Sequence, residues 1–172
     1  MTRDSESLPI EASQDSNFVE TYDQLLQHLF LSKQSGSIEE IYIAPQNLQH
    51  ATWLASIIAL GSSETLKNLA NSFGALLHLY APKNPAFQRA CYILQSRSGN
   101  LLSSKHIPNI FNEGKYQNSF GALIDLELGS TRGRLTHKLE SGGEFVFTDY
   151  QTRLWSAIRS GSNVAISAPT SA

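Results

Sequence analysis

Apolar residues recur three and four positions apart in four stretches between residues 17 and 97. This spacing places the apolar side chains on one face of a helix with 3.6 residues per turn. The sequence therefore predicts four amphipathic helices whose apolar faces can pack together. The faces consist of Leu25, Leu26, Leu29 and Phe30; Trp53, Leu54, Ile57 and Ile58; Leu66, Leu69, Phe73, Leu76, Leu77 and Tyr80; and Phe87, Cys91 and Leu94.

Capping and helix-breaking residues mark the ends of these helices. Asn17 with Glu20 has the spacing of a capping box and predicts the start of the first helix. Pro45 begins the second, and Asn84 followed by Pro85 begins the fourth, because asparagine suits the N-cap and proline the first helical position. The expected stops are residues 35–37, Gly61, Pro82 and residues 98–100.

Other stretches are less regular. Residues 38–43 fit either a strand or part of a short helix, and residues 101–121 show no long element. Residues 120–139 are expected to be helical in part, with interruptions at Gly129 and Gly133.

The pattern divides the chain into four parts. Residues 1–15 are polar and acidic and are expected to be a disordered leader. Residues 16–140 are expected to form a mainly α domain that resembles a helical bundle or a solenoid. Residues 141–143 are Ser-Gly-Gly and predict a linker, after which residues 144–172 change in character.

The composition is that of a folded protein without a global basic field. Hydrophobic residues make up 41% of the 172 residues, the formal net charge is −2 and the pI is about 6.2. No apolar run is long enough to cross a membrane, and the first residues lack the pattern of a signal peptide. We expect a cytoplasmic protein without a membrane partner, or a nuclear one if its source is eukaryotic. Cys91 is expected to be a buried small hydrophobe.

Residues 144–172 have the order in which a P-loop ATPase core begins. Thr148 and Gln151 have capping-box spacing and predict a helix, which Gly161 ends. Tyr150, Leu154, Trp155 and Ile158 form its apolar face. Residues 164–166 are a short apolar run typical of a buried parallel strand, and a loop of small residues follows.

These residues resemble the Q motif and motif I of superfamily 2 helicases of the DEAD/DEAH-box-like type. Phe147, Tyr150 and Gln151 match the aromatic residue and the aromatic–glutamine pair of the Q motif. The first five positions of motif I are matched by Ala168, Pro169, Thr170, Ser171 and Ala172. The resemblance covers about 29 of the 172 residues and implies the start of a RecA-like P-loop α/β domain, which is incomplete here.

The resemblance also implies roles for these residues. Gln151 would hydrogen-bond the adenine edge, Phe147 would pack near the base, and residues 168–172 would begin the phosphate cradle. ATP and Mg²⁺ would be the cofactors of the intact parent protein, and single-stranded or duplex nucleic acid its partner through lobes beyond these residues. Because Gly-Lys-Ser/Thr and the acidic pair of motif II are missing from the chain, we expect no ATP hydrolysis and no tight nucleotide binding by residues 1–172 alone.

Other interpretations stay open. The chain can be a helical protein–protein interaction module without ATPase activity, or part of another P-loop enzyme such as a restriction-system translocase. For Gln151 the simpler role is a helix cap, and for Phe147 and Trp155 it is core packing. The basic residues Arg132, Arg134, His137 and Lys138 are expected to form a solvated face. The five histidines are scattered without the spacing of metal ligands.

Overall fold

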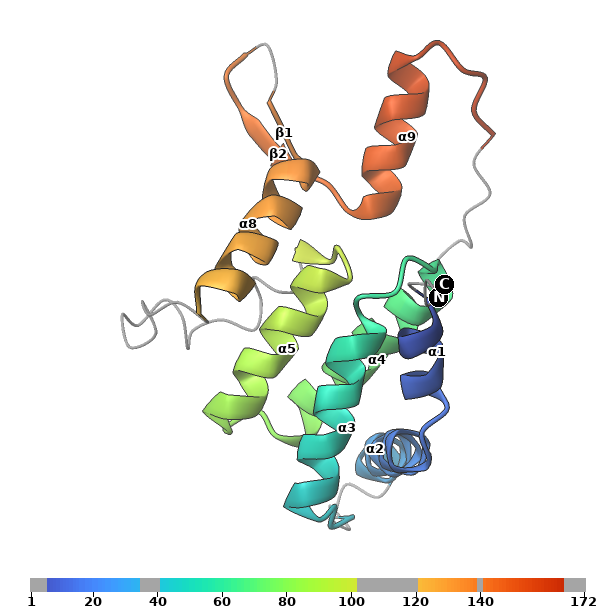
Figure 1. The fold of residues 1–172 in the computed structure, drawn as a ribbon, viewed down its shortest axis with the longest axis vertical. Helices are drawn as coiled ribbons and strands as arrows, with labels where there is room; N and C mark the ends of the chain where they lie inside the picture. The colour runs from blue at the N-terminus through green and yellow to red at the C-terminus, as the bar shows by residue number, and fades with distance from the viewer. Residues whose placement is uncertain (1–5, 35–40, 102–120, 139–140, 166–172) are drawn as a thin grey trace, which may run out of the picture.

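The computed structural model describes residues 6–34, 41–101, 121–138 and 141–165, and this part of the chain is mainly helical. It contains seven helices and one small antiparallel sheet (Figure 1). The helices are α1 (Ser7–Ser13), α2 (Ser16–Gln34), α3 (Pro45–Ile58), α4 (Glu64–Tyr80), α5 (Pro85–Arg97), α8 (Ala122–Leu135) and α9 (Asp149–Arg159), and the strands are β1 (Thr136–Lys138) and β2 (Glu144–Val146). The mainly α fold class is therefore confirmed.

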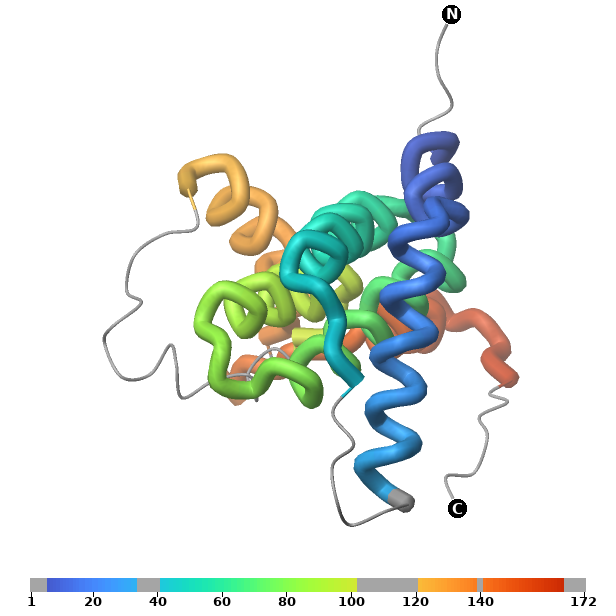
Figure 2. Tube along the Cα trace, turned by 90° about the horizontal axis from the view of Figure 1, so that it is seen from below, coloured from blue at the N-terminus to red at the C-terminus, as the bar shows by residue number. Residues whose placement is uncertain are grey.

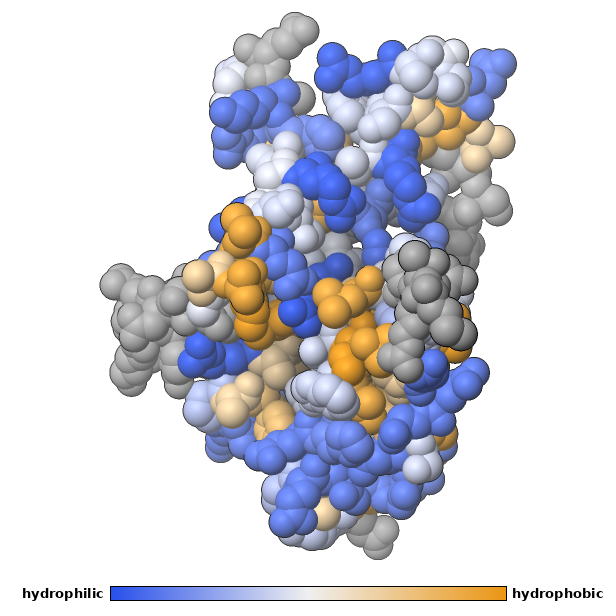
Figure 3. All heavy atoms as spheres, viewed as in Figure 1, coloured by the Kyte–Doolittle hydropathy of each residue, from blue (hydrophilic) through white to orange (hydrophobic). Residues whose placement is uncertain are grey.

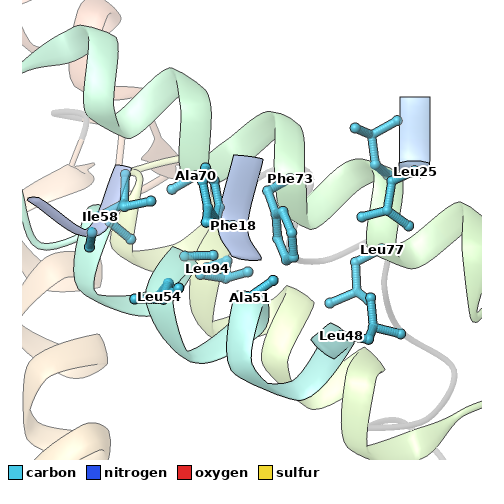
Figure 4. Close-up of a cluster of buried hydrophobic side chains, with 14 of the residues drawn as sticks. Phe18, Leu25, Leu48, Ala51, Leu54, Ile58, Ala70, Phe73, Leu77 and Leu94 are labelled. Atoms are coloured by element: carbon cyan, nitrogen blue, oxygen red, sulfur yellow. The ribbon is translucent and has the colours of Figure 1, made fainter. Parts of the chain in front are cut away.

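Helices α1 to α5 form a bundle around the hydrophobic core (Figure 4). Helix α2 crosses α3 at a large angle. In Figure 1 α2 is seen almost end-on, whereas α3 lies close to the plane of the picture, and Figure 2 shows the two helices from below. Phe18 of α2 and Phe73 of α4 meet in the core with their ring centroids 5.4 Å apart. Ala51, Ala55 and Ala70 are fully buried, and their small side chains let the helices approach closely.

Most of the predicted apolar positions are buried. The buried members are Leu25, Leu54, Ile58, Leu66, Phe73, Leu76, Leu77, Cys91 and Leu94. Phe30 and Trp53 differ, because 62% and 58% of their surfaces are exposed. The buried stripe of each helix is narrower than the apolar face in the sequence, and these two side chains lie beside it.

Several predicted helix boundaries are confirmed by hydrogen bonds. The side chain of Asn84 accepts from the backbone N–H groups of Ala86 and Phe87 at 3.0 and 3.3 Å, and Pro85 follows it as the first helical residue. The start of α2 differs from the prediction. Asp15, rather than Asn17, accepts from the N–H groups of Asn17 and Phe18 at 2.9 and 3.4 Å, because its carboxylate lies just before the first turn.

The predicted disordered leader is wrong for residues 7–13, which form α1. Pro9 and Ala12 are buried, and α1 packs against α3. Just before α1, the carboxylate of Glu6 accepts from the hydroxyl of Ser62 and, at 2.7 Å, from its backbone N–H. These hydrogen bonds lower the pKa of Glu6. Burial and hydrogen bonding to a distant loop order this segment, and neither contact is visible in its polar composition.

Two further expectations for residues 120–143 are also wrong. Helix α8 continues through Gly129 and Gly133, since isolated glycines weaken a helix without having to end it. Residues 141–143 belong to the connection of a hairpin in which β1 and β2 pair with Thr136 opposite Val146 and Lys138 opposite Glu144. The predicted linker therefore lies inside a paired element, and the hairpin spans the predicted domain boundary.

The strand predicted at residues 164–166 is not formed in the part that the structure describes. Val164 and Ala165 are exposed and belong to no strand, and Ile166 lies outside the described residues. A parallel strand needs neighbours that cover its backbone, and the described part of the chain offers none beside these residues. Within the described ranges no helix is both long and apolar enough to span a membrane.

Candidate functional site

Helix α9 carries Tyr150 and Gln151, two of the residues on which the predicted helicase resemblance depends, and both of its ends are closed by local hydrogen bonds. Thr148 accepts from the backbone N–H of Gln151 at 3.2 Å, while Gln151 accepts from the backbone N–H of Thr148 at 2.9 Å. This is the predicted capping box. At the other end Gly161 has φ +75°, and the N–H groups of Gly161 and Ser162 bond to the carbonyls of Ile158 and Ala157. This Schellman motif ends the helix where the sequence predicted.

The capping box determines which atoms of Gln151 are occupied. Its Oε1 accepts the Thr148 N–H, and the side chain as a whole is exposed. The Nε2 group, with two donor hydrogens, is therefore on the solvent side of the first turn. The two roles considered for Gln151 are compatible: Oε1 caps the helix, and Nε2 is free to donate to a ligand.

Phe147 lies between the hairpin and α9. Its ring is 5.0 Å from the ring of His137 and meets the edge of Trp155 at 5.9 Å between centroids. Phe147 is half-buried and Trp155 is 36% exposed. The packing role is therefore realised for both rings.

The apolar face of α9 is only partly covered: Trp155 packs against Phe147 and Leu154 is half-buried. Tyr150 and Ile158 are 48% and 53% exposed, and no residue of α9 is buried. An amphipathic helix normally buries this face. The face is thus available to a part of the protein, or to a partner, outside the described residues.

A polar cleft of about 480 Å³ separates the start of α9 from the bundle. Its walls come from the first half of α4, the end of α5 and the first turn of α9. In Figure 1 the start of α9 lies near the end of α5, and Gly99, just after α5, is close to Asp149. The lining includes Lys67, Asn71, Asn100, Asp149 and Arg153.

Asp149 forms ion pairs with two basic side chains at this cleft. One oxygen accepts from Lys67 Nζ at 3.0 Å, and the other accepts from Arg134 Nη1 at 2.6 Å. Partial burial by itself would raise the pKa of Asp149, but the hydrogen bonds from Lys67 and Arg134 outweigh it and lower the pKa. The carboxylate is therefore charged at neutral pH. The outermost pair, Arg153 with Glu64 at 3.2 Å, is well exposed on both sides.

The predicted basic cluster is largely solvated. Lys138 has 81% of its side chain exposed and forms a 3.6 Å pair with Glu144, while Arg134 is engaged by Asp149. Sequence reasoning did not single out Asp149 or Lys67. The position of Asp149 in the first turn of a helix was a sequence signal for a functional or capping role. Nothing in the sequence indicated that Lys67, 82 positions away, would be its partner.

The remaining predicted site residues cannot be placed. Ala168, Pro169, Thr170, Ser171 and Ala172 lie outside the described residues. In the described ranges no three His, Cys, Asp or Glu side chains are grouped as metal ligands. Cys91 is buried, and this burial raises the pKa of its thiol to about 12. Comparison of the chain with protein-family models, curated proteins and solved structures finds no match.

Proposed function

We propose that residues 1–172 form the N-terminal part of an ATP-dependent DNA or RNA helicase or translocase. In this proposal the bundle is an accessory domain, and residues 144–172 begin the nucleotide-binding core. The observation that supports it most is the first turn of α9, where Gln151 caps the helix with Oε1 and keeps Nε2 exposed. That arrangement suits a glutamine that donates to an adenine ring nitrogen.

The exposed part of the apolar face of α9 is in line with this proposal. In a RecA-like core the helix that precedes the P-loop strand packs on a parallel sheet, and that sheet would be built from residues beyond those described. Tyr150 and Ile158 would then be buried. ATP and Mg²⁺ would be bound by the completed core, and nucleic acid would be the partner.

The decisive test distinguishes the helix-capping role of Gln151 from a role in binding adenine. In the natural gene product that contains residues 1–172, Gln151→Glu keeps an oxygen for the Thr148 N–H but removes the Nε2 donor. The loss of one hydrogen bond to the base is expected to raise the KM for ATP by about tenfold. The KM for GTP should change less, and helix content should stay constant by circular dichroism.

The matched control is Thr148→Ser, which preserves the hydroxyl cap and should leave both KM values unchanged. Absence of nucleic-acid-stimulated ATP hydrolysis in the natural gene product would overturn the proposal. An unchanged KM for ATP in Gln151→Glu would remove the adenine role of Gln151.

A second candidate function is a helical protein–protein interaction module. It is favoured by exposed apolar residues on α8, where Leu123 and Leu126 are 83% and 73% exposed. Figure 3 shows hydrophobic residues gathered over this helix. A groove of about 290 Å³ lies beside it, and Trp53, Ile93 and Ile124 are among its lining residues. Such a surface is typical of a protein-binding site. A stable complex that Leu126→Asp abolishes, together with absent ATP turnover, would favour this alternative.

A further inference from the structure

Asp149 occupies a socket formed by three elements of the fold. Lys67 of α4 and Arg134 of α8 hold its two carboxylate oxygens at 3.0 and 2.6 Å. The third wall is Gly99, just after the end of α5. A Cβ atom on Gly99 would lie only 3.1 Å from Asp149 Cγ, and φ at Gly99 is +76°. The positive φ favours glycine there, and a larger side chain would also press on the carboxyl group.

The contacts that hold α9 against the bundle are polar. Asp149 and Arg153 reach Lys67 and Glu64 of α4, and no residue of α9 is buried. The Arg153–Glu64 pair has both side chains more than 60% exposed and therefore contributes little. The Asp149 side chain is 19% exposed, so its two ion pairs are less screened by solvent and salt.

We propose that Asp149 is a latch by which the bundle holds α9 in one orientation across the polar cleft. With the latch closed, the first turn of α9 is fixed against α4, α5 and α8. No residue of α9 is fully buried, and the ring contact of Trp155 is with Phe147 rather than with the bundle. Release of α9 from the bundle therefore breaks mainly the ion pairs and exposes no core residue of α9. Gln151 lies two residues after Asp149 and is held by its own capping box, so the same docking sets where the capped Gln151 lies relative to the bundle.

The inference does not depend on the helicase proposal, because it concerns how α9 is held and is tested without nucleotide. The first experiment measures amide hydrogen exchange of residues 149–159 in the full chain. Lys67→Met removes a socket residue that lies outside α9 and leaves the capping box intact. We expect exchange of residues 149–159 to become about five- to tenfold faster, since a partly buried, charge-assisted hydrogen bond is lost.

Asp149→Asn should give an increase at least as large. The double variant should be no faster than Asp149→Asn alone, because both substitutions break the same contact. Raising the salt concentration to about 1 M, where the screening length is about 3 Å, should accelerate exchange in the wild type and have little effect in Asp149→Asn.

The matched control is Glu144→Gln, which removes a carboxylate from the exposed pair with Lys138 and should leave the exchange of α9 unchanged. Gly99→Ala tests the socket by shape alone and should accelerate exchange although every charge is kept. If Lys67→Met and Arg134→Met each change the exchange of α9 by less than twofold while Asp149→Asn accelerates it, Asp149 acts only on its own helix terminus and the latch is refuted. If none of these variants accelerates it, the latch is refuted as well.

Discussion

The ion pair between Arg97 and Glu127 attaches α8 to the bundle and offers a quantitative test of the fold. Arg97 Nε and Nη2 donate to the two oxygens of Glu127, both at 2.7 Å. Arg97 Nη1 also donates to the carbonyl and the hydroxyl of Ser56 at 3.1 Å. Only 12% of the Arg97 side chain is exposed, against 33% for Glu127. Leu135 is the one buried residue of α8, so this pair is a main attachment of the helix.

The burial of the two partners determines the size of the effect. Removing one partner of a fully buried pair costs about 3–5 kcal/mol, whereas an exposed pair contributes about 0–1 kcal/mol. In Arg97→Met the Glu127 carboxylate can rehydrate, but the Ser56 carbonyl loses its donor. We therefore expect the free energy of unfolding to fall by about 2 kcal/mol. Glu127→Gln should lower it by about 1 kcal/mol, because one hydrogen bond from the Arg97 guanidinium to the neutral amide oxygen remains.

The measurement is urea unfolding of the two single variants and the double variant, followed by far-ultraviolet circular dichroism. The double-mutant cycle should give a coupling energy of about 1 kcal/mol, and amide exchange should be faster in α8 than in α3 or α4. Lys138→Met is the control, since its 81%-exposed side chain should change the stability by less than about 0.5 kcal/mol. Additive effects of the two substitutions would refute the reasoning that the pair acts as one attachment.

Three further results are expected. Phe73→Ala should destabilise the bundle by about 3–5 kcal/mol because the ring is fully buried, while Trp53→Ala should cost less than about 1 kcal/mol in the same urea titration; equal effects would contradict the assignment of the core. The Cys91 thiol, with its pKa raised to about 12, should resist iodoacetamide at pH 8 and react only after unfolding, and rapid labelling of the native chain would contradict its burial. Because the pKa of Asp149 is lowered, its contribution to α9 docking should be constant above the ordinary aspartate pKa of about 3.9 and be lost as the pH falls below it. Amide exchange of α9 as a function of pH, corrected for the intrinsic rate, checks this sign.

The elements with strong local signals were predictable from the sequence. The period of α4, the Asn84–Pro85 start of α5 and the capping box of α9 depend on residues within one or two turns of each other. Such interactions can be predicted because the residues that make them are close together in the sequence. For the same reason the sequence predicted that Cys91 is buried, since its neighbours on one helical face are apolar.

The sequence predictions were wrong where contacts between residues far apart in the chain determine the structure. Helix α1 is ordered by packing on α3 and by the hydrogen bonds between Glu6 and Ser62, which are 56 positions apart. The sequence signal at residues 141–143 was local, whereas the hairpin around them forms by pairing of β1 with β2.

The sequence by itself determined the mainly α class and the principal helices, whereas nucleotide binding through residues 144–172 stays a prediction. Only the tertiary structure decided which faces are covered and which charges meet. It brought Lys67, Gly99 and Arg134 around Asp149 and left Tyr150 and Ile158 on the apolar face of α9 exposed. The physical reason is that helix formation and capping depend on residues close together in the sequence. Burial and ion pairing depend on which distant segments the fold brings into contact.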